Sequence, residues 1–255
     1  MTSQSSTPSS APKNERTAFI VTIDGPAASG KSSVSRELGH RLGWSWVSTG
    51  AFYRGLAYIA HVKKADITNE DEIVKLAQSP DWSVEMTTQQ TCVFMDSPKS
   101  SNGGQGTSQR IDVTDEIGRE EYGSLASKIS SFPKVRKALL DAQRHCAIGL
   151  PGLIAEGRDC GTVVFPQAHV KIFLTARAED RAARRAKDEN RDVGQLVSEQ
   201  KTRDDQDASR KASPLQAPVD GHLIDTTDLS LIEVVEKVEE LVKRHPQRHQ
   251  AAPTP

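Results

Sequence analysis

The stretch DGPAASGKSS, from Asp24 to Ser33, constrains the fold more than any other part of this sequence. It contains the pattern Gly-x-x-x-x-Gly-Lys-Ser, follows the apolar run FIVTI and precedes VSRELGHRLG, which continues in a helical pattern. Glycines let consecutive backbone N–H groups converge on phosphate oxygens, and a helix N-terminus favours negative charge. A chance match in a Gly/Ser-rich loop is the alternative, and the flanking strand and helix argue against it. The sequence therefore predicts a strand, a phosphate-binding loop and a helix.

The loop also predicts which groups hold a nucleoside triphosphate. Lys31 is expected between the β- and γ-phosphates, and the Ser32 hydroxyl is expected to ligate Mg²⁺. The triphosphate is expected to contact the whole loop: Gly25, Pro26, Ala27, Ala28, Ser29, Gly30, Lys31, Ser32 and Ser33. The pattern leaves open whether the γ-phosphate is hydrolysed or transferred to an acceptor.

The rest of the chain alternates between short apolar runs and helical patterns. Strands are expected at 18–24, 44–48, 152–159, 169–176 and 222–227, and core helices at 31–43, 50–64 and 229–245. Thr49 is expected to cap the second helix. Strands alternating with helices at this pitch indicate an α/β protein with a parallel sheet and right-handed crossovers.

The segment from 65 to 149 lacks this rhythm and is predicted to be an insertion. It contains a short helix at 70–79, a two-stranded antiparallel ribbon from WSVEM and TCVFM, and two helices at 114–130 and 132–149. The loop at 96–110 is flexible by composition. Two charged helices, at 177–190 and 193–213, are expected before the last strand.

Composition limits the possible partners. The 255 residues include 33 basic and 34 acidic side chains, which argues against nucleic-acid binding through bulk charge. No apolar run approaches the roughly 20 residues of a membrane span. Cys92, Cys146 and Cys160 form no metal or disulfide pattern, which fits a reducing cytosol. The Ser/Thr/Pro-rich segment 1–16 lacks the apolar region of a secretory signal, and it and segment 246–255 are expected to be disordered tails.

Arginines distinguish a transferase from a hydrolase here. The chain has no Asn-Lys-x-Asp guanine motif and no apolar strand ending in Asp-Glu. Arg54, Arg136 and Arg158 lie beside predicted turns or on helices, Arg181, Arg184 and Arg185 share one helical face, and Arg203, Asp207 and Arg210 share another. Taken alone, the 181–185 cluster predicts a solvated face, Arg203–Asp207 an ordinary i,i+4 pair, and Arg158–Asp159 either a structural or a functional turn. Together they exceed what one triphosphate needs and indicate a second phosphorylated ligand.

Six motifs in one order resemble the bacterial-type cytidylate kinases, within the nucleoside monophosphate kinases. They are TIDGPAASGKSS, STGAFYR, FPKVRKALLDAQR, GLIAEGRDCGTVVFP, VKIFLTA and RDDQDASRKASPL, and the similarity runs from Phe19 to Arg244. The resemblance implies transfer of the ATP γ-phosphoryl group to CMP or dCMP. It implies a P-loop NTPase fold with a five-stranded parallel sheet in a core of 17–48, 150–176 and 212–245, a monophosphate-binding insert at 49–149 and a lid at 177–211.

The resemblance also implies roles for individual residues. Thr49, Arg54 and Arg158 would hold the CMP phosphate, while Ser127, Arg136 and Asp159 would read cytosine. Arg203, Asp207 and Arg210 would contact the sugar and phosphate edge. The catalytic cations would be Lys31, Arg158, Arg181 and Arg185, with Arg184 as a further lid cation. No general base is expected, because the acceptor phosphate is largely ionised near pH 7, and the seven histidines are expected to be structural or exposed.

Two features depart from many relatives. The sequence Ile117-Gly118-Arg119 stands where Ile-Arg-Thr is common, so Arg119 is given no site role. Cys160 stands where Met is frequent and is expected to pack rather than react.

Two alternative functions remain open: a P-loop kinase for a sugar or a shikimate-like acid, and a nucleotide-dependent switch without an acceptor. Nothing in the sequence suggests more than a monomer.

Overall fold

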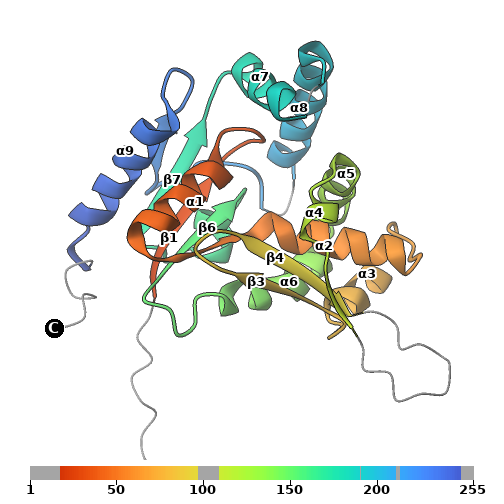
Figure 1. Ribbon diagram of the computed structural model, residues 1–255. Coiled ribbons are helices and arrows are strands. Elements are labelled where there is room, and N and C mark those ends of the chain that lie inside the picture. The colour runs from red at the N-terminus through yellow and green to blue at the C-terminus, as the bar shows by residue number, and fades with distance from the viewer. Residues whose placement is uncertain (1–17, 97–108, 190, 211–212, 248–255) are drawn as a thin grey trace, which may run out of the picture.

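The chain forms a five-stranded parallel sheet with helices on both faces and a smaller three-stranded sheet at one side (Figure 1). The computed structural model describes residues 18–96, 109–189, 191–210 and 213–247. Most of both expected tails and most of the 96–110 loop lie outside these residues.

The large sheet has the order β2-β6-β1-β7-β8, and every neighbouring pair is parallel. Its strands are β1 (Phe19–Asp24), β2 (Ser45–Ser48), β6 (Gly152–Gly157), β7 (Val170–Thr175) and β8 (His222–Asp225). The predicted strands and α/β class are therefore confirmed. Because β1 and β6 are adjacent although 127 residues lie between the end of β1 and the start of β6, the inserted segment returns to the sheet beside the phosphate loop.

The two faces of this sheet carry separate hydrophobic clusters. Consecutive residues of a strand point to opposite faces, and Leu153 and Ile154 of β6 accordingly belong to different clusters. Ile154 packs with α1 (Lys31–Leu42) and α9 (Leu231–Arg244), whereas Leu153 packs with α2 (Thr49–Val62) and α6 (Pro133–His145). Both residues are fully buried, so the sheet is covered on both sides.

The insert is built on α2. Its antiparallel sheet has the order β3 (Trp82–Met86), β4 (Thr91–Asp96), β5 (Arg110–Asp112), so the predicted ribbon has a third strand. Val93 and Met95 of β4 pack on Ile59 of α2. The insert also contains α3 (Glu70–Ala77).

The single helix expected at 114–130 is wrong in detail. The chain forms α4 (Thr114–Ile117) and then α5 (Glu120–Ile129), with extended backbone at Arg119 between them. Gly118 lies at this break, and glycine in a helix interior costs about 1 kcal/mol relative to alanine. The break gives α5 its own N-terminus, which begins with Glu120 and Glu121.

Helices α7 (Ala178–Glu189) and α8 (Val193–Ala208) pack against each other as a hairpin. Their shared hydrophobic cluster is small, consisting of Ala182, Ala186 and Leu196 with Val197 beside it. In Figure 1 the hairpin lies at the upper end of the molecule, on the side of the sheet where β1 and β6 end.

Candidate active site

The phosphate loop joins the end of β1 to the first turn of α1. Gly25 has a φ of +148°, and a Cβ there would lie 2.1 Å from the Leu174 carbonyl oxygen, so only glycine fits beside β7. Gly30 has a φ of +92° and immediately precedes Lys31, the first residue of α1. The loop thus has the backbone shape that the motif predicted.

Lys31 lies folded back on its own loop. Its Nζ donates to the Pro26 carbonyl oxygen at 2.6 Å. Burial, followed by the nearby charge of Arg158, lowers the pKa of Lys31 to about 7. A triphosphate in the loop would oppose both effects, because negative charge favours the protonated amine.

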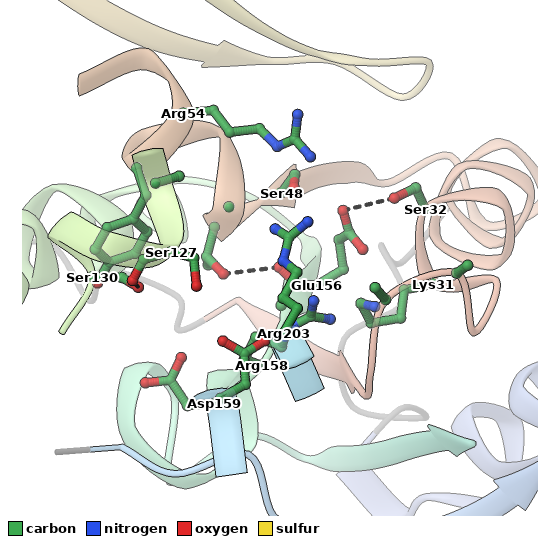
Figure 2. A pocket seen from close by; sticks show the side chains of 18 of the residues that line it. Lys31, Ser32, Ser48, Arg54, Ser127, Ser130, Glu156, Arg158, Asp159 and Arg203 are labelled. Atoms are coloured by element: carbon green, nitrogen blue, oxygen red, sulfur yellow. Dashed lines mark hydrogen bonds and ion pairs between the residues drawn. The ribbon is translucent and has the colours of Figure 1, made fainter. Parts of the chain in front are cut away.

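Glu156 is a candidate site residue that sequence reasoning missed. It lies near the end of β6, next to β1, is 4% exposed, and accepts a hydrogen bond of 2.9 Å from the Ser32 hydroxyl (Figure 2). The signal was available in GLIAEG: a carboxylate at the end of an apolar strand, without the second acid of the Asp-Glu pattern. Ser32 and Glu156 present hydroxyl and carboxylate oxygens, the hard ligands that Mg²⁺ takes.

Asp24, also missed, ties the end of β1 to the segment after β6. Its carboxylate accepts from the backbone N–H groups of Cys160 and Gly161, at 2.8 and 2.7 Å. These residues begin a π-helical turn (Cys160–Val164). Burial raises the pKa of Asp24 to about 6, against the two hydrogen bonds.

Arg158, immediately after β6, connects the phosphate loop with α8. Its Nε donates to Asp207 at 2.6 Å, and its Nη1 donates to the Gly25 carbonyl oxygen at 2.6 Å. Asp207 is 1% exposed and also pairs with Arg210. Asp207 therefore holds two cations, and the ordinary i,i+4 pair considered for Arg203 and Asp207 is not what the structure has.

Asp159 points to the opposite end of the site from the phosphate loop. It forms an ion pair with Arg136 of α6, whose Nη1 also donates to the Ser130 carbonyl oxygen at 3.3 Å. Burial raises the pKa of Asp159 while the Arg136 charge opposes that shift. Figure 2 shows Ser127 and Ser130 at this end, with Lys31 and Ser32 across the cavity and Arg158 and Arg203 between them.

Thr49 is the first residue of α2 rather than its cap. Ser48 occupies the cap position, and the Thr49 hydroxyl donates to the Glu156 carbonyl oxygen at 2.9 Å. One turn later, Arg54 donates to the carbonyl oxygens of Ile117 and Gly118, at 3.0 and 3.1 Å. Burial lowers the pKa of Arg54. The guanidinium thus rests on the break that precedes α5.

The α7 arginines do not form a solvated face, which is what the 181–185 cluster taken alone predicted. Arg181 is 6% exposed, pairs with Asp204 at 2.6 Å and donates to the Ala27 carbonyl oxygen at 3.0 Å. Arg184 turns away and donates to the Thr226 carbonyl oxygen at 2.6 Å. Arg185 pairs with Glu120 and is the one of the three that lines the cavity described below.

Arg203 of α8 completes the set. Its Nη1 lies 3.8 Å from Glu120, and its Nε is buried without a hydrogen-bond partner among the described residues. Burial, and then the charges of Arg158 and Arg54, lower the pKa of Arg203 to about 10. A buried cationic donor without an acceptor is costly, and an entering anion would satisfy it.

These side chains line one cavity of about 280 Å³. Among the described residues, seven basic and four acidic side chains line it: Lys31, Arg54, Arg136, Arg158, Arg185, Arg203 and Arg210, and Glu120, Glu156, Asp159 and Asp207. Thr49, Ser127, Ala27, Ala28 and Ser32 also line it, whereas Arg181 does not. The excess of cations and the span from the phosphate loop to Asp159 suit two phosphorylated groups bound end to end.

The described helices include none long and apolar enough to cross a membrane.

The sequence profile of the family described as Cytidylate kinase matches residues 21–244. A cytidylate kinase of Bdellovibrio bacteriovorus is 52% identical over 225 residues, covering 88% of this chain and 98% of the relative. A cytidylate kinase of Colwellia psychrerythraea is 42% identical over 226 residues, covering 86% and 93%.

Among solved structures, a shikimate kinase of Bacteroides thetaiotaomicron aligns with 88% of this chain and 98% of its own, at a TM-score of 0.42 and 10% identity. That likeness is too distant to bear on the acceptor.

Proposed function

The chain belongs to the cytidylate kinase family, and from this premise we infer that it transfers the γ-phosphoryl group of ATP to CMP or dCMP, forming ADP and CDP or dCDP. The observation that carries this is the cavity in which seven basic side chains join a phosphate loop to the Arg136–Asp159 pair. One triphosphate does not require cations at both ends. A hydrolase, which has no acceptor nucleotide to bind, would not require the Arg136–Asp159 end of the cavity.

We propose that the phosphate loop, from Gly25 to Ser33, is the donor half of the site. Its backbone N–H groups and Lys31 would hold the ATP phosphates, and phosphate contact would draw the Lys31 amine away from the Pro26 carbonyl oxygen. Ser32 and Glu156 would hold Mg²⁺, which neutralises phosphate charge when bound. The described residues contain no group of three or more His, Cys, Asp or Glu side chains suited to a metal. A donor set of one hydroxyl and one carboxylate still fits Mg²⁺, which takes its remaining ligands from phosphates and water.

The acceptor half is proposed to be the arginine set around β6, α2 and α8. Thr49, Arg54 and Arg158 would bind the acceptor phosphate, and Arg203, Asp207 and Arg210 the sugar and its phosphate edge. Arg158 suits the space between the two nucleotides, because Asp207 and Gly25 fix its guanidinium from opposite sides. Arg181 and Arg185 would neutralise charge on the transferring group, with Arg181 acting from its position against the loop at Ala27.

Asp159, Arg136 and Ser127 are proposed to read the base. Cytosine presents an N4 amino group that a carboxylate accepts, whereas uracil presents an O4 acceptor at that place. A buried acid facing O4 would be left without a donor, which disfavours uracil nucleotides. No side chain has to remove a proton, because the acceptor oxygen is already ionised. Catalysis then consists of alignment and charge stabilisation.

The division of the chain follows from these roles. We propose a core of 17–48, 150–176 and 212–245, an acceptor-binding insert at 49–149 and a lid at 177–211. We also propose that the enzyme acts as a monomer in the cytoplasm without nucleic-acid partners, since its three cysteines are unpaired and its substrates are small nucleotides.

An assay of ADP release with CMP, dCMP, UMP and AMP tests this function. We expect the highest kcat/KM with CMP or dCMP. Higher turnover with AMP, or none with CMP, would contradict the proposal.

The base-reading role is tested by Asp159→Ala. We expect the preference for CMP over UMP to fall roughly tenfold to a hundredfold, because a charge-assisted hydrogen bond contributes about 1.5–3 kcal/mol. The KM for ATP should change much less. Asp205→Ala, which removes an exposed carboxylate from α8, is the control. If Asp159→Ala weakened the interaction with CMP and with ATP equally, Asp159 would not be a base-reading residue.

A further inference from the structure

Glu120 is the one cavity-lining acid that no part of the proposed mechanism uses. It is the first residue of α5, and its two carboxylate oxygens face different helices. Oε2 pairs with Arg185 of α7, and Oε1 lies 3.8 Å from Nη1 of Arg203 of α8. Glu120 therefore connects α5 to both helices of the α7–α8 hairpin through ion pairs.

The setting of this carboxylate resembles that of a phosphate. The side chains of Arg185 and Arg203 are 10% and 20% exposed, so both guanidiniums have lost much of their water. Arg203 also lies close to the positive charges of Arg158 and Arg54, which disfavour its charge, while Glu120 favours it. A carboxylate with two oxygens gives two guanidiniums the contacts that phosphate oxygens would give.

Glu120 also stands where it can be exposed to solvent once the arginines leave it. It lines the main cavity and an adjoining one of about 460 Å³, between α5 and the hairpin, which Arg185 and Arg203 line as well. Its side chain is 34% exposed, more than either partner. A released Glu120 can therefore be hydrated, whereas a phosphate beside an unmoved Glu120 would meet like charge.

We propose that Glu120 is an internal counter-ion that competes with substrate phosphate for Arg185 and Arg203, and so sets how tightly the enzyme holds its nucleotides. The inference rests on the proposed function, since it takes the arginines to be phosphate ligands. Before substrate enters, Glu120 stabilises the two buried cations and ties the hairpin to α5. When phosphate arrives, the arginines exchange one anion for another.

Glu120→Gln tests the exchange, with Glu121→Gln as the matched control in the same turn. Glutamine keeps the shape and removes the charge, and Glu121 is exposed and interacts with Tyr122 instead. Dissociation constants are measured by calorimetry for CMP and ADP, and for cytidine and adenosine, which lack phosphate. We expect Glu120→Gln to bind CMP or ADP roughly fivefold more tightly, the size of one partly exposed ion pair. Nucleoside binding and the control variant should not change.

Unchanged or weaker binding of both nucleotides by Glu120→Gln would overturn the inference and make Glu120 a structural partner. An equal gain for nucleosides would overturn it too, because the gain would not come from phosphate. If Glu120→Gln does not fold, Glu120→Asp replaces it, because the shorter side chain withdraws the carboxylate by one methylene. The same dissociation constants are then measured, with the same expected and contradicting results. Failure of the wild-type protein to bind CMP would contradict the proposed function instead, and ADP binding would still test the exchange.

Discussion

At the scale of single residues, Glu156 connects the two halves of the site. Its side chain accepts from Ser32 of the phosphate loop, while its backbone carbonyl oxygen accepts from Thr49 on the acceptor side. Asp207 forms ion pairs with Arg158 and Arg210, and Asp159 forms one with Arg136. Acidic residues thus fix the positions of the basic ones, and orientation of this kind is what phosphoryl transfer requires.

The proposed role of Glu156 as a Mg²⁺ ligand predicts the response to Glu156→Gln. An amide is neutral and a poorer ligand for Mg²⁺, so the Mg²⁺ concentration for half-maximal activity should rise roughly tenfold or more. Activity as a function of Mg²⁺ concentration measures this. Glu37→Gln, which removes an exposed carboxylate paired with Arg41 on α1, should not alter the requirement. An unchanged requirement in Glu156→Gln would place the ion elsewhere.

Asp24 predicts a pH dependence of stability. Because burial raises its pKa from 3.8 to about 6, the folded protein keeps a proton near pH 5 that the unfolded chain has released. The contribution of this group is therefore fully present below its unfolded pKa and is lost as the pH rises through about 6. The change is at most about 3 kcal/mol, at about 1.4 kcal/mol per pKa unit.

Urea unfolding of the wild-type protein and of Asp24→Asn, from pH 4 to pH 8, isolates this contribution. The free energy of unfolding of the wild type, minus that of the variant, should fall between pH 4 and about 6 and stay constant above. A difference that rises with pH would show that the hydrogen bonds from Cys160 and Gly161 outweigh burial.

At the scale of elements, the site depends on how the end of β6 meets α2. Gly157 lies at this junction, where a Cβ would come 2.2 Å from the Thr49 hydroxyl and 2.8 Å from the Cys160 sulfur. Within the α7–α8 hairpin, the two helices are joined by a cluster of three buried apolar residues and by ion pairs such as Arg181–Asp204. At the first junction there is no room for a further methyl group, whereas the hairpin contacts α5 through the ion pairs of Arg185 and Arg203 with Glu120.

Gly157→Ala should damage stability and activity together. The added methyl group must displace Thr49 or Cys160, at a cost of about 1–3 kcal/mol for an overpacked site, and it moves Arg158 with the strand end. Thermal unfolding and kcat/KM for CMP measure the two effects. Gly194→Ala is the control, since its Cβ would meet only Oδ1 of Asp192, at 3.2 Å, and no backbone atom. Full activity in Gly157→Ala would mean that the junction tolerates movement.

At the scale of the whole molecule, one hydrophobic cluster joins the large sheet to the insert. Leu153 of β6 packs in the same cluster as Leu56 of α2 and Leu139 of α6. The opposite face of the sheet is covered by α1 and α9 around Ile154. The insert therefore shares one hydrophobic cluster with the sheet, beside a smaller cluster of its own around Ile59 and Val93.

This packing predicts that the sheet and the insert unfold together. Leu153→Ala and Ile154→Ala should each lower the free energy of unfolding by about 2–5 kcal/mol, the range for fully buried residues. In Leu153→Ala, tryptophan fluorescence reports Trp82 in the insert, Trp46 in β2 and Trp44 just before that strand. It should follow the same denaturant curve as far-UV circular dichroism. Two separated transitions would contradict a shared core.

The sequence alone determined the phosphate loop, the parallel sheet and most helices, because those patterns are local: glycines at fixed offsets, apolar runs and helical periodicity. It also identified the arginines that line the cavity. It did not identify Glu156, Asp24 or Glu120, nor which acid pairs with which arginine. Ser32 and Glu156 are 124 positions apart, and only packing of β6 beside β1 brings them together. Local patterns reveal backbone shape, whereas the balance of buried charges depends on distances between remote segments, and the tertiary structure alone sets those.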